Sequence, residues 1–224
     1  MRQTVRDFWD ACEKCDIETI KKLYFVIENL DTSGFEIGYH TKYQMGRAVE
    51  NGNLNVIKCL RGCGGDIEDT LLITAARNNN VDIVDYLLLN NVNIQCVASH
   101  GKTALHIAAA NGNVDIVKKL LETQKCDVNN PDDDDETPLF YAVRSDVIEI
   151  VDLLITYGAD YYHLNSIGNN LLHLAASKKN RELVERILSL GLDITHKNQD
   201  GKDPLYYAYA SENTVNIELL STTY

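Results

Sequence analysis

The chain contains 224 residues, of which 33 are acidic and 21 basic, so its formal net charge is −12 at pH 7. This charge disfavours binding to nucleic acid and to anionic membranes, and no basic stripe with interleaved aromatic residues offsets it. The N-terminus lacks the apolar region of a secretory signal peptide, no apolar run could span a bilayer, and the six cysteines follow no disulfide framework. We therefore expect a cytoplasmic protein with reduced thiols, although a nuclear location or delivery into a host cell by a non-classical route fits the same features.

Two degenerate helix-turn-helix units open the chain. Residues 9–23 read WDACEKCDIETIKKL, with apolar residues at helical spacing on either side of a turn, and residues 46–57 repeat the arrangement. The loop that follows is short, because Asp66 lies only four positions before Thr70, where the corresponding step in a later unit is ten. It predicts a break in any surface that such loops form. We assign these first two units to residues 4–30 and 41–67.

Five clearer copies of one pattern follow at a nearly constant period. Equivalent positions, separated by steps of 33, 34, 33 and 33 residues, hold Thr70, Thr103, Thr137, Asn170 and Asp203. A fixed period of this length is typical of a solenoid, in which similar units stack on one another. We therefore predict a single array over residues 1–224. Its last five units are residues 68–97, 98–131, 132–164, 165–197 and 198–224.

The clearest copy, GKTALHIAAANGNVDIVKKLL over residues 101–121, shows what each position does. Leu105 and Ala108 share one face of a first helix, and Ile116 and Val117 share one face of a second. Gly112, between the two helices, suits a turn with positive φ. In later units the position of Gly112 holds residues other than glycine, and each costs about 1 kcal/mol with positive φ. We therefore expect the units after the first such residue to be softer. These residues are Asp146, Lys179 and Glu212.

The run TALHIAA resembles the T-P-L-H-x-A signature of the ankyrin repeat. The resemblance covers five full copies and the two degenerate ones. It implies an all-α solenoid of stacked helix-turn-helix units, with a short β-hairpin finger before each first helix. It also implies that His106 and His173 bond to the backbone of the neighbouring finger. The other histidines should be solvated, namely His40, His100, His163 and His196.

In the ankyrin family the fingers and first helices line the binding face, and this places twelve residues of the chain there. The fingertip candidates are His100, Asp133, Asp134, Ile167, Gln199 and Asp200. The candidates at the ends of first helices are Arg77, Asn78, Asn111, Arg144, Ser145 and Lys178. Three of these are cations, so we predict a mixed-charge groove beside acidic fingers, with Ile167 as an apolar contact at a tip.

The acidic run Asp132–Asp135 has two readings. It is either a solvated loop or an acidic fingertip that steers a basic partner. It lacks the alternating spacing of a calcium loop. Two tyrosines of the last unit, Tyr206 and Tyr209, occupy the His and Ala positions of the pattern, where side chains pack. Thr214 and Asn216 replace apolar residues, and we interpret them as a polar C-terminal cap.

These features favour an intracellular protein–protein interaction module that is monomeric and binds a protein partner of unknown identity. We expect no enzyme activity, cofactor, metal, nucleic acid or membrane, and none of the common nucleotide-binding, hydrolase or zinc-protease motifs occurs. One alternative is a structural adaptor, or an inhibitor that caps a partner enzyme or transcription factor. A second is a thiol or metal sensor that uses Cys12 and Cys15. Asn129 lies in a loop that resembles the hydroxylation site of some animal ankyrin-repeat proteins.

Overall fold

The computed structural model describes residues 2–30 and 35–223. These residues form fourteen α-helices and one short 3-10 helix, and the chain divides into two compact units, Met1–Cys96 and Val97–Tyr224, which we call unit 1 and unit 2. Each unit is described by itself, and the single array over residues 1–224 stays a prediction. None of the helices in the described ranges is both long and apolar enough to cross a bilayer.

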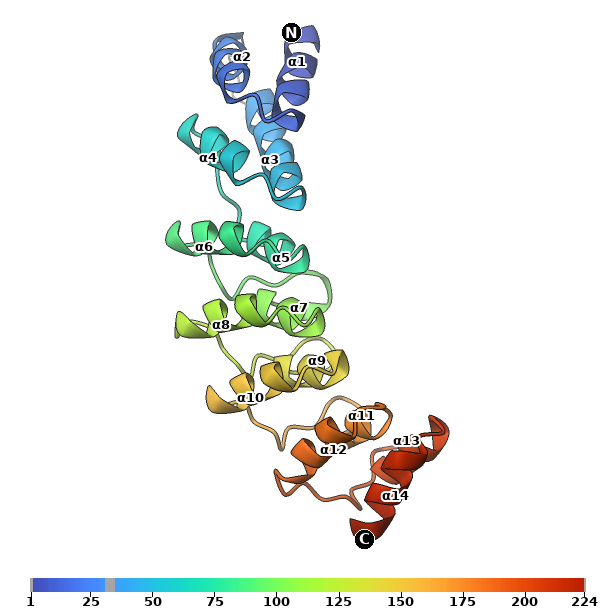
Figure 1. The fold of residues 1–224 in the computed structure, drawn as a ribbon. Helices are drawn as coiled ribbons and strands as arrows, with labels where there is room; N and C mark the ends of the chain where they lie inside the picture. Colours follow the sequence, from blue (N-terminus) through green and yellow to red (C-terminus); the bar gives the residue numbers. More distant parts are fainter. Residues whose placement is uncertain (1, 31–34, 224) are drawn as a thin grey trace. The chain divides into compact units, whose positions relative to one another are not determined.

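Unit 1 consists of three helix pairs (Figure 1). Within each pair the two helices pack together, the first helices stack α1 on α3 on α5, and α2 packs on α4. The helices of unit 1 are α1 (Arg2–Glu13), α2 (Ile17–Leu30), α3 (Phe35–Glu50), α4 (Leu54–Gly62), α5 (Thr70–Arg77) and α6 (Val81–Leu89).

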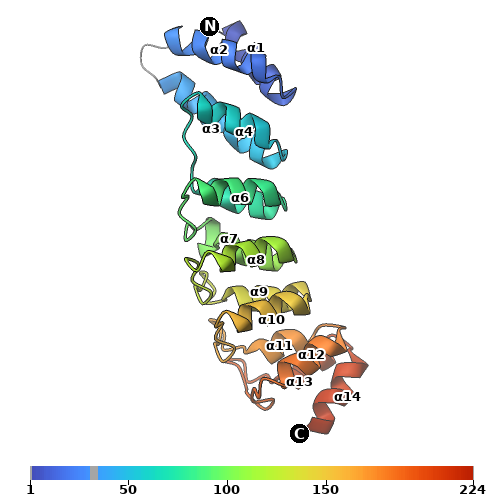
Figure 2. The same ribbon diagram turned by 60° about the vertical axis from the view of Figure 1, so that its left-hand side comes forward.

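Unit 2 consists of four helix pairs of the same kind. Its odd-numbered helices stack on one another and form one layer, and the even-numbered helices form the second layer (Figures 1 and 2). Its elements are η1 (Ser99–Gly101), α7 (Ala104–Ala110), α8 (Val114–Glu122), α9 (Pro138–Ser145), α10 (Ile148–Thr156), α11 (Leu171–Ala176), α12 (Arg181–Leu188), α13 (Pro204–Ala210) and α14 (Thr214–Thr223).

The core of unit 2 lies between these two layers. Ala108 and Ala109 are fully buried, and their small side chains let the first helices approach closely. Ile116, Val117 and Leu120 of α8 are also fully buried and face this layer. Each such aliphatic side chain stabilises the fold by about 1.5–3 kcal/mol. Because the buried faces meet between neighbouring pairs, stability comes from stacking and not from any single pair.

The turns between paired helices largely follow the predicted chemistry. Gly112 has φ +70°, and Asp146 and Glu212 adopt the same left-handed region with φ values of 65° and 54°. Lys179 does not, so that part of the prediction is wrong. Helix α11 ends early, at Ala176, and the Lys178 N–H closes its last turn on the Ala175 carbonyl, so the chain continues without a left-handed residue. The lower protection of the units after Asp146 stays a prediction.

The predicted fingers are present in unit 2 as tight loops. One backbone hydrogen bond closes each, from the N–H of Ala98, Asp132, Asn165 or Asn198 to the carbonyl four residues on, at 2.8–3.1 Å. They are too short for regular strands, and an isolated pairing of Val97 with Thr103 is the only β-bridge among the described residues. The segment between α4 and α5 instead folds back on α4, where the Gly65 N–H donates to the Leu60 carbonyl at 2.9 Å, as expected for a shortened loop.

Candidate functional site

The four fingers of unit 2 are joined by backbone hydrogen bonds from each tip to the next. The Asp133 N–H donates to the His100 carbonyl at 3.2 Å, Ser166 N–H to Asp134 at 3.0 Å, and Gln199 N–H to Ile167 at 3.0 Å. These bonds use the main chain, and the Gln199 side chain adds one more, because its Nε2 donates to the Ser166 carbonyl at 2.9 Å. All six predicted fingertip residues are exposed. Ile167 retains 47% exposure, a large apolar side chain where water is expected.

Close approach of the first two fingers requires a glycine. Gly101 has φ +68°, and a Cβ built on it would lie 2.8 Å from Asp133 Oδ1 and 3.1 Å from the Asp133 amide nitrogen. The first distance is shorter than real Cβ contacts and the second is tighter than nine in ten of them, so a side chain here would require Asp133 to shift. The preceding residue, His100, is also left-handed, with φ 63°. The finger row is therefore fixed by backbone geometry before any partner binds.

The acidic run Asp132–Asp135 divides between surface and interior. Asp133, Asp134 and Asp135 are exposed, but Asp132 is 5% exposed and organises its finger from within. Its Oδ1 accepts the Asp134 and Glu136 amides at 2.9 Å, and its Oδ2 accepts the Tyr141 hydroxyl. Burial alone would raise the pKa of Asp132, yet these hydrogen bonds outweigh it and lower the pKa below its usual value. Both earlier readings were incomplete, since each treated the run as surface.

Arg144 is exposed but pairs with a buried carboxylate. Its Nη2 donates to both carboxylate oxygens of Glu136, at 2.6 and 2.8 Å, and the Glu136 side chain is only 8% exposed. The guanidinium carbon also lies 5.0 Å from the centre of the Tyr141 ring, and Lys102 Nζ lies 5.0 Å from the same ring. Asn165 Nδ2 donates to Glu136 Oε1 at 3.2 Å and links this cluster to the next finger. The cluster therefore fixes the base of a finger against the first helices.

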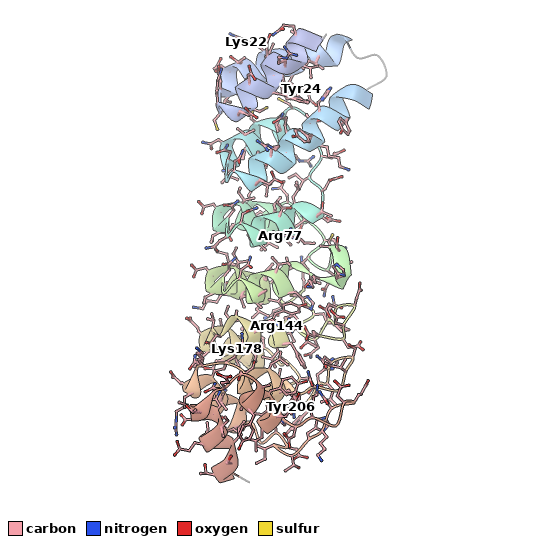
Figure 3. The ribbon with its side chains drawn as sticks, turned by 90° about the vertical axis from the view of Figure 1, so that its right-hand side faces the viewer. Lys22, Tyr24, Arg77, Arg144, Lys178 and Tyr206 are labelled. Atoms are coloured by element: carbon pink, nitrogen blue, oxygen red, sulfur yellow. The ribbon has the colours of Figure 1, made fainter. Side chains whose placement is uncertain are left out.

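The other helix-end candidates are also engaged locally. Lys178 Nζ donates to the Arg144 carbonyl, and Figure 3 shows the two residues side by side. The Ser145 hydroxyl donates to the Ala142 carbonyl at 3.0 Å, and Asn78 Nδ2 to the Thr74 carbonyl at 3.0 Å. Asn111 and Arg77 are exposed and have contacts of their own, and Arg77 and Asn78 lie in unit 1. In unit 2 the two cations of the predicted mixed-charge groove are thus already bonded to groups of the protein itself.

The two motif histidines behave as predicted. The Thr103 N–H donates to His106 Nδ1 at 3.1 Å, so the proton lies on Nε2, which donates to the Glu136 carbonyl at 3.1 Å. His173 repeats this, with Nε2 3.2 Å from the Lys202 carbonyl. Burial lowers the pKa of both imidazoles, which keeps them neutral.

Three of the remaining histidines are not simply solvated, contrary to expectation. His163 Nε2 lies 2.8 Å from the Asp135 carbonyl and His196 Nε2 lies 3.0 Å from the Gly168 carbonyl, so both tie a loop to the preceding finger. His40 packs edge-on against Trp9 in unit 1, with ring centres 5.5 Å apart. His100 is exposed as predicted.

The last helix pair also differs from expectation. Asn216 is fully buried, and its Nδ2 donates to the carbonyls of Ala176 and Lys178 at 3.1 and 2.6 Å. It therefore clamps α14 onto the previous pair and is no surface cap. Tyr206 and Tyr209 do not pack as predicted, because they are 47% and 58% exposed on α13, the first helix of the last pair.

The cysteines sit where the repeat pattern places them. Cys12 is 4% exposed, and burial, with smaller contributions from Cys59, Cys15 and Cys63, raises the pKa of its thiol to about 12. Cys15 is exposed and takes the left-handed turn position with φ 55°. Within the described residues, no group of three or more His, Cys, Asp or Glu side chains is arranged to hold a metal ion. Because the pKa of Cys12 is raised to about 12, its thiolate is strongly disfavoured at neutral pH.

Three residues at the finger bases order the fingers from inside. Asp132, Asn165 and Asn198 lie 33 residues apart, and each accepts backbone amides of its own finger through Oδ1. Glu136 and Tyr141 act with the first of them. The 33-residue spacing was a usable signal for these three positions, whereas the pairing of Glu136 with Arg144 depends on tertiary packing.

Comparison with known proteins agrees with this geometry. Four overlapping segments, residues 45–132, 82–165, 112–198 and 139–223, match the family model described as ankyrin repeats. An ankyrin repeat protein of fowlpox virus is 31% identical over 120 residues, which cover 50% of this chain and 28% of that protein. Human ankyrin repeat and SOCS box protein 11 is 37% identical over 106 residues, covering 47% and 32%. The phosphocholine transferase AnkX of Legionella pneumophila is 25% identical over 138 residues, covering 57% and 14%. The chain thus spans less than a third of the length of these relatives.

Proposed function

Because the chain belongs to the ankyrin-repeat family, whose repeats are generally protein–protein interaction modules, we propose that unit 2 binds a protein partner through its finger face. The finger face comprises the four fingers, residues 98–102, 132–136, 165–169 and 198–202, and the exposed ends of the first helices beside them. The observation that carries the proposal is the row of finger-to-finger hydrogen bonds, because it orders the tips while their side chains stay exposed.

Pre-ordered tips favour binding because little conformational entropy remains to be lost. Fixing one backbone residue costs roughly 1–2 kcal/mol, so ordering several flexible tips on binding would consume much of the affinity. Three of the six exposed tip side chains are acidic, namely Asp133, Asp134 and Asp200, and Ile167 is apolar. The partner surface should therefore offer basic groups around an apolar pocket. Arg144 and Lys178 are held by Glu136 and by the Arg144 carbonyl, so they are not expected to make the main contacts.

A pull-down from the native host tests this proposal, with tip variants chosen so that the fold is kept. Asp134 and Ile167 contribute only their backbones to the finger row, so Asp134→Lys and Ile167→Asp should fold normally. We expect each variant to weaken capture of the partner at least fivefold. Matched control variants on the even-numbered helices are Glu182→Lys at the start of α12 and Tyr157→Asp at the end of α10. Equal loss in tip and control variants, or no loss in either, contradicts the proposal.

The same experiment separates the adaptor and inhibitor alternatives. A structural spacer would tolerate tip substitutions, whereas an inhibitor that caps an enzyme or transcription factor would lose both capture and inhibition. We further propose that the chain acts as a monomer in the cytoplasm and has no catalytic role of its own. Light scattering and cell fractionation test the first two statements. Group transfer to the captured partner by the purified chain would contradict the third.

A further inference from the structure

An open groove of about 570 Å³ lies between α2 and α4 in unit 1. Its lining residues are Ile17 and Lys21 of α2, then Asn55, Lys58, Cys59 and Gly62 of α4, and finally Cys63. Cys59 is buried at its floor, and the two lysines are exposed at its rim. No carboxylate lines the groove. It lies in unit 1, whereas the finger face consists of residues of unit 2, so the two surfaces share no residue.

The repeat pattern shows what is missing from this groove. In unit 2 an ion pair connects two neighbouring even-numbered helices. Lys118 Nζ of α8 lies 2.7 Å from Glu149 Oε1 of α10. Lys21 occupies the repeat position of Lys118, and Asn55 occupies that of Glu149. Lys21 therefore faces an amide where its counterpart has a carboxylate.

The second rim lysine is also without a carboxylate. Lys58 lies 5.7 Å from the centre of the Tyr86 ring, and neither it nor Lys21 forms an ion pair with any residue that the structure describes. Two exposed ammonium groups at one rim, neither of them in an ion pair with a described residue, favour an anionic ligand.

Small side chains on α4 create the space between the lysines. Cys59 occupies the repeat position of Tyr86 and Arg186, which are much larger. Gly62 occupies that of Leu89, and a Cβ built on Gly62 would meet no heavy atom within 4 Å. The groove is therefore open because of particular residues of α4, and a larger side chain could fill it without strain.

We propose that this groove binds an acidic amphipathic helix of a partner protein. Asn55, Lys58, Cys59, Gly62 and Cys63 recur at helical spacing along one stripe, which at 1.5 Å per residue is about 12 Å long, or roughly two turns of a bound helix. An apolar side chain of the guest would lie against Ile17 and Cys59. Carboxylates one turn apart would reach Lys21 and Lys58, so charge selects the guest and apolar contact holds it.

Selection from a displayed library of random 16-residue peptides tests this proposal. The library is enriched on the wild-type chain alone, and the enriched peptides are then measured on Gly62→Leu, which carries the side chain found at Leu89. Enriched peptides should have net negative charge and an apolar residue every third or fourth position. Their affinity, measured by fluorescence anisotropy, should fall at least tenfold for Gly62→Leu and for the double variant Lys21→Glu/Lys58→Glu.

Matched controls keep this test separate from the proposed function. The double variant Lys179→Glu/Lys197→Glu reverses two exposed lysines of unit 2 and should leave binding within twofold. Ile167→Asp should do the same, even if it abolishes partner capture at the finger face. The proposal is overturned if no peptide is enriched, if enriched peptides are basic, or if Gly62→Leu binds them as tightly as wild type.

Discussion

Replacing Arg144 by alanine should destabilise unit 2, because it leaves a buried carboxylate without its cation. Glu136 is 8% exposed on its side chain and would keep only the 3.2 Å hydrogen bond from Asn165. Hydrogen bonds to charged groups contribute about 1.5–3 kcal/mol. Because the Arg144 side chain is 46% exposed, water can partly replace it, and we expect a loss of about 2 kcal/mol. With a urea m-value of about 2.5 kcal/mol/M, the midpoint of unfolding should fall by about 0.8 M.

Urea unfolding followed by circular dichroism measures this effect, with Arg181→Ala as the matched control. Arg181 Nε lies 2.7 Å from Glu185 Oε1 in an exposed pair one turn apart, which should contribute no more than about 0.5 kcal/mol. In the double variant Arg144→Ala/Glu136→Gln the buried charge is gone, and at least about 1 kcal/mol should be recovered. If Arg144→Ala costs no more than Arg181→Ala, the buried ion pair does not anchor the finger as we describe.

Three further predictions follow from individual groups. Burial lowers the pKa of His106 and His173, so the unfolded chain binds protons before the folded one as pH falls through about 6.5. The free energy of unfolding should therefore be lower at pH 5.5 than at pH 7.5. Urea midpoints at the two pH values check this, and the double variant His106→Gln/His173→Gln should lose the difference. Iodoacetamide should modify Cys15 in the folded chain and spare Cys12, as read by mass spectrometry, and rapid modification of Cys12 would restore the thiol-sensor alternative. Gly101→Ala should destabilise by about 1 kcal/mol more than Gly201→Ala, since both are left-handed but only Gly101 has a finger within 4 Å of its added Cβ; equal urea midpoints would show that the fingers do not abut.

The sequence predicted the parts of this fold that depend on local spacing. The 33-residue period located the helix pairs and the fingers, and the His106 and His173 contacts followed from the motif. The left-handed turns at Asp146 and Glu212 followed from the position of Gly112. The left-handed turn predicted at Lys179 does not form, because α11 ends at Ala176 and the turn follows a different path. The alignment of repeats does not reveal this difference.

The candidate site was harder to predict because it depends on packing across repeats. Arg144 is exposed, as its position indicates, but its pairing with Glu136, eight residues earlier at the base of a finger, could not be read from that position. Asn216 looked like a surface residue, but its carbonyl partners lie 38 and 40 residues away. Tyr209 looked like a packed residue, but it is exposed on α13. Burial and pairing of these side chains are tertiary properties that periodicity does not encode.

Hydrogen–deuterium exchange of the chain with and without its captured partner tests the central claim most directly. We predict that the partner protects the finger amides over residues 98–102, 132–136, 165–169 and 198–202, together with the ends of α9 and α11. Protection confined to α8, α10 and α12, with unchanged exchange in the fingers, would contradict the assignment of the finger face as the binding surface.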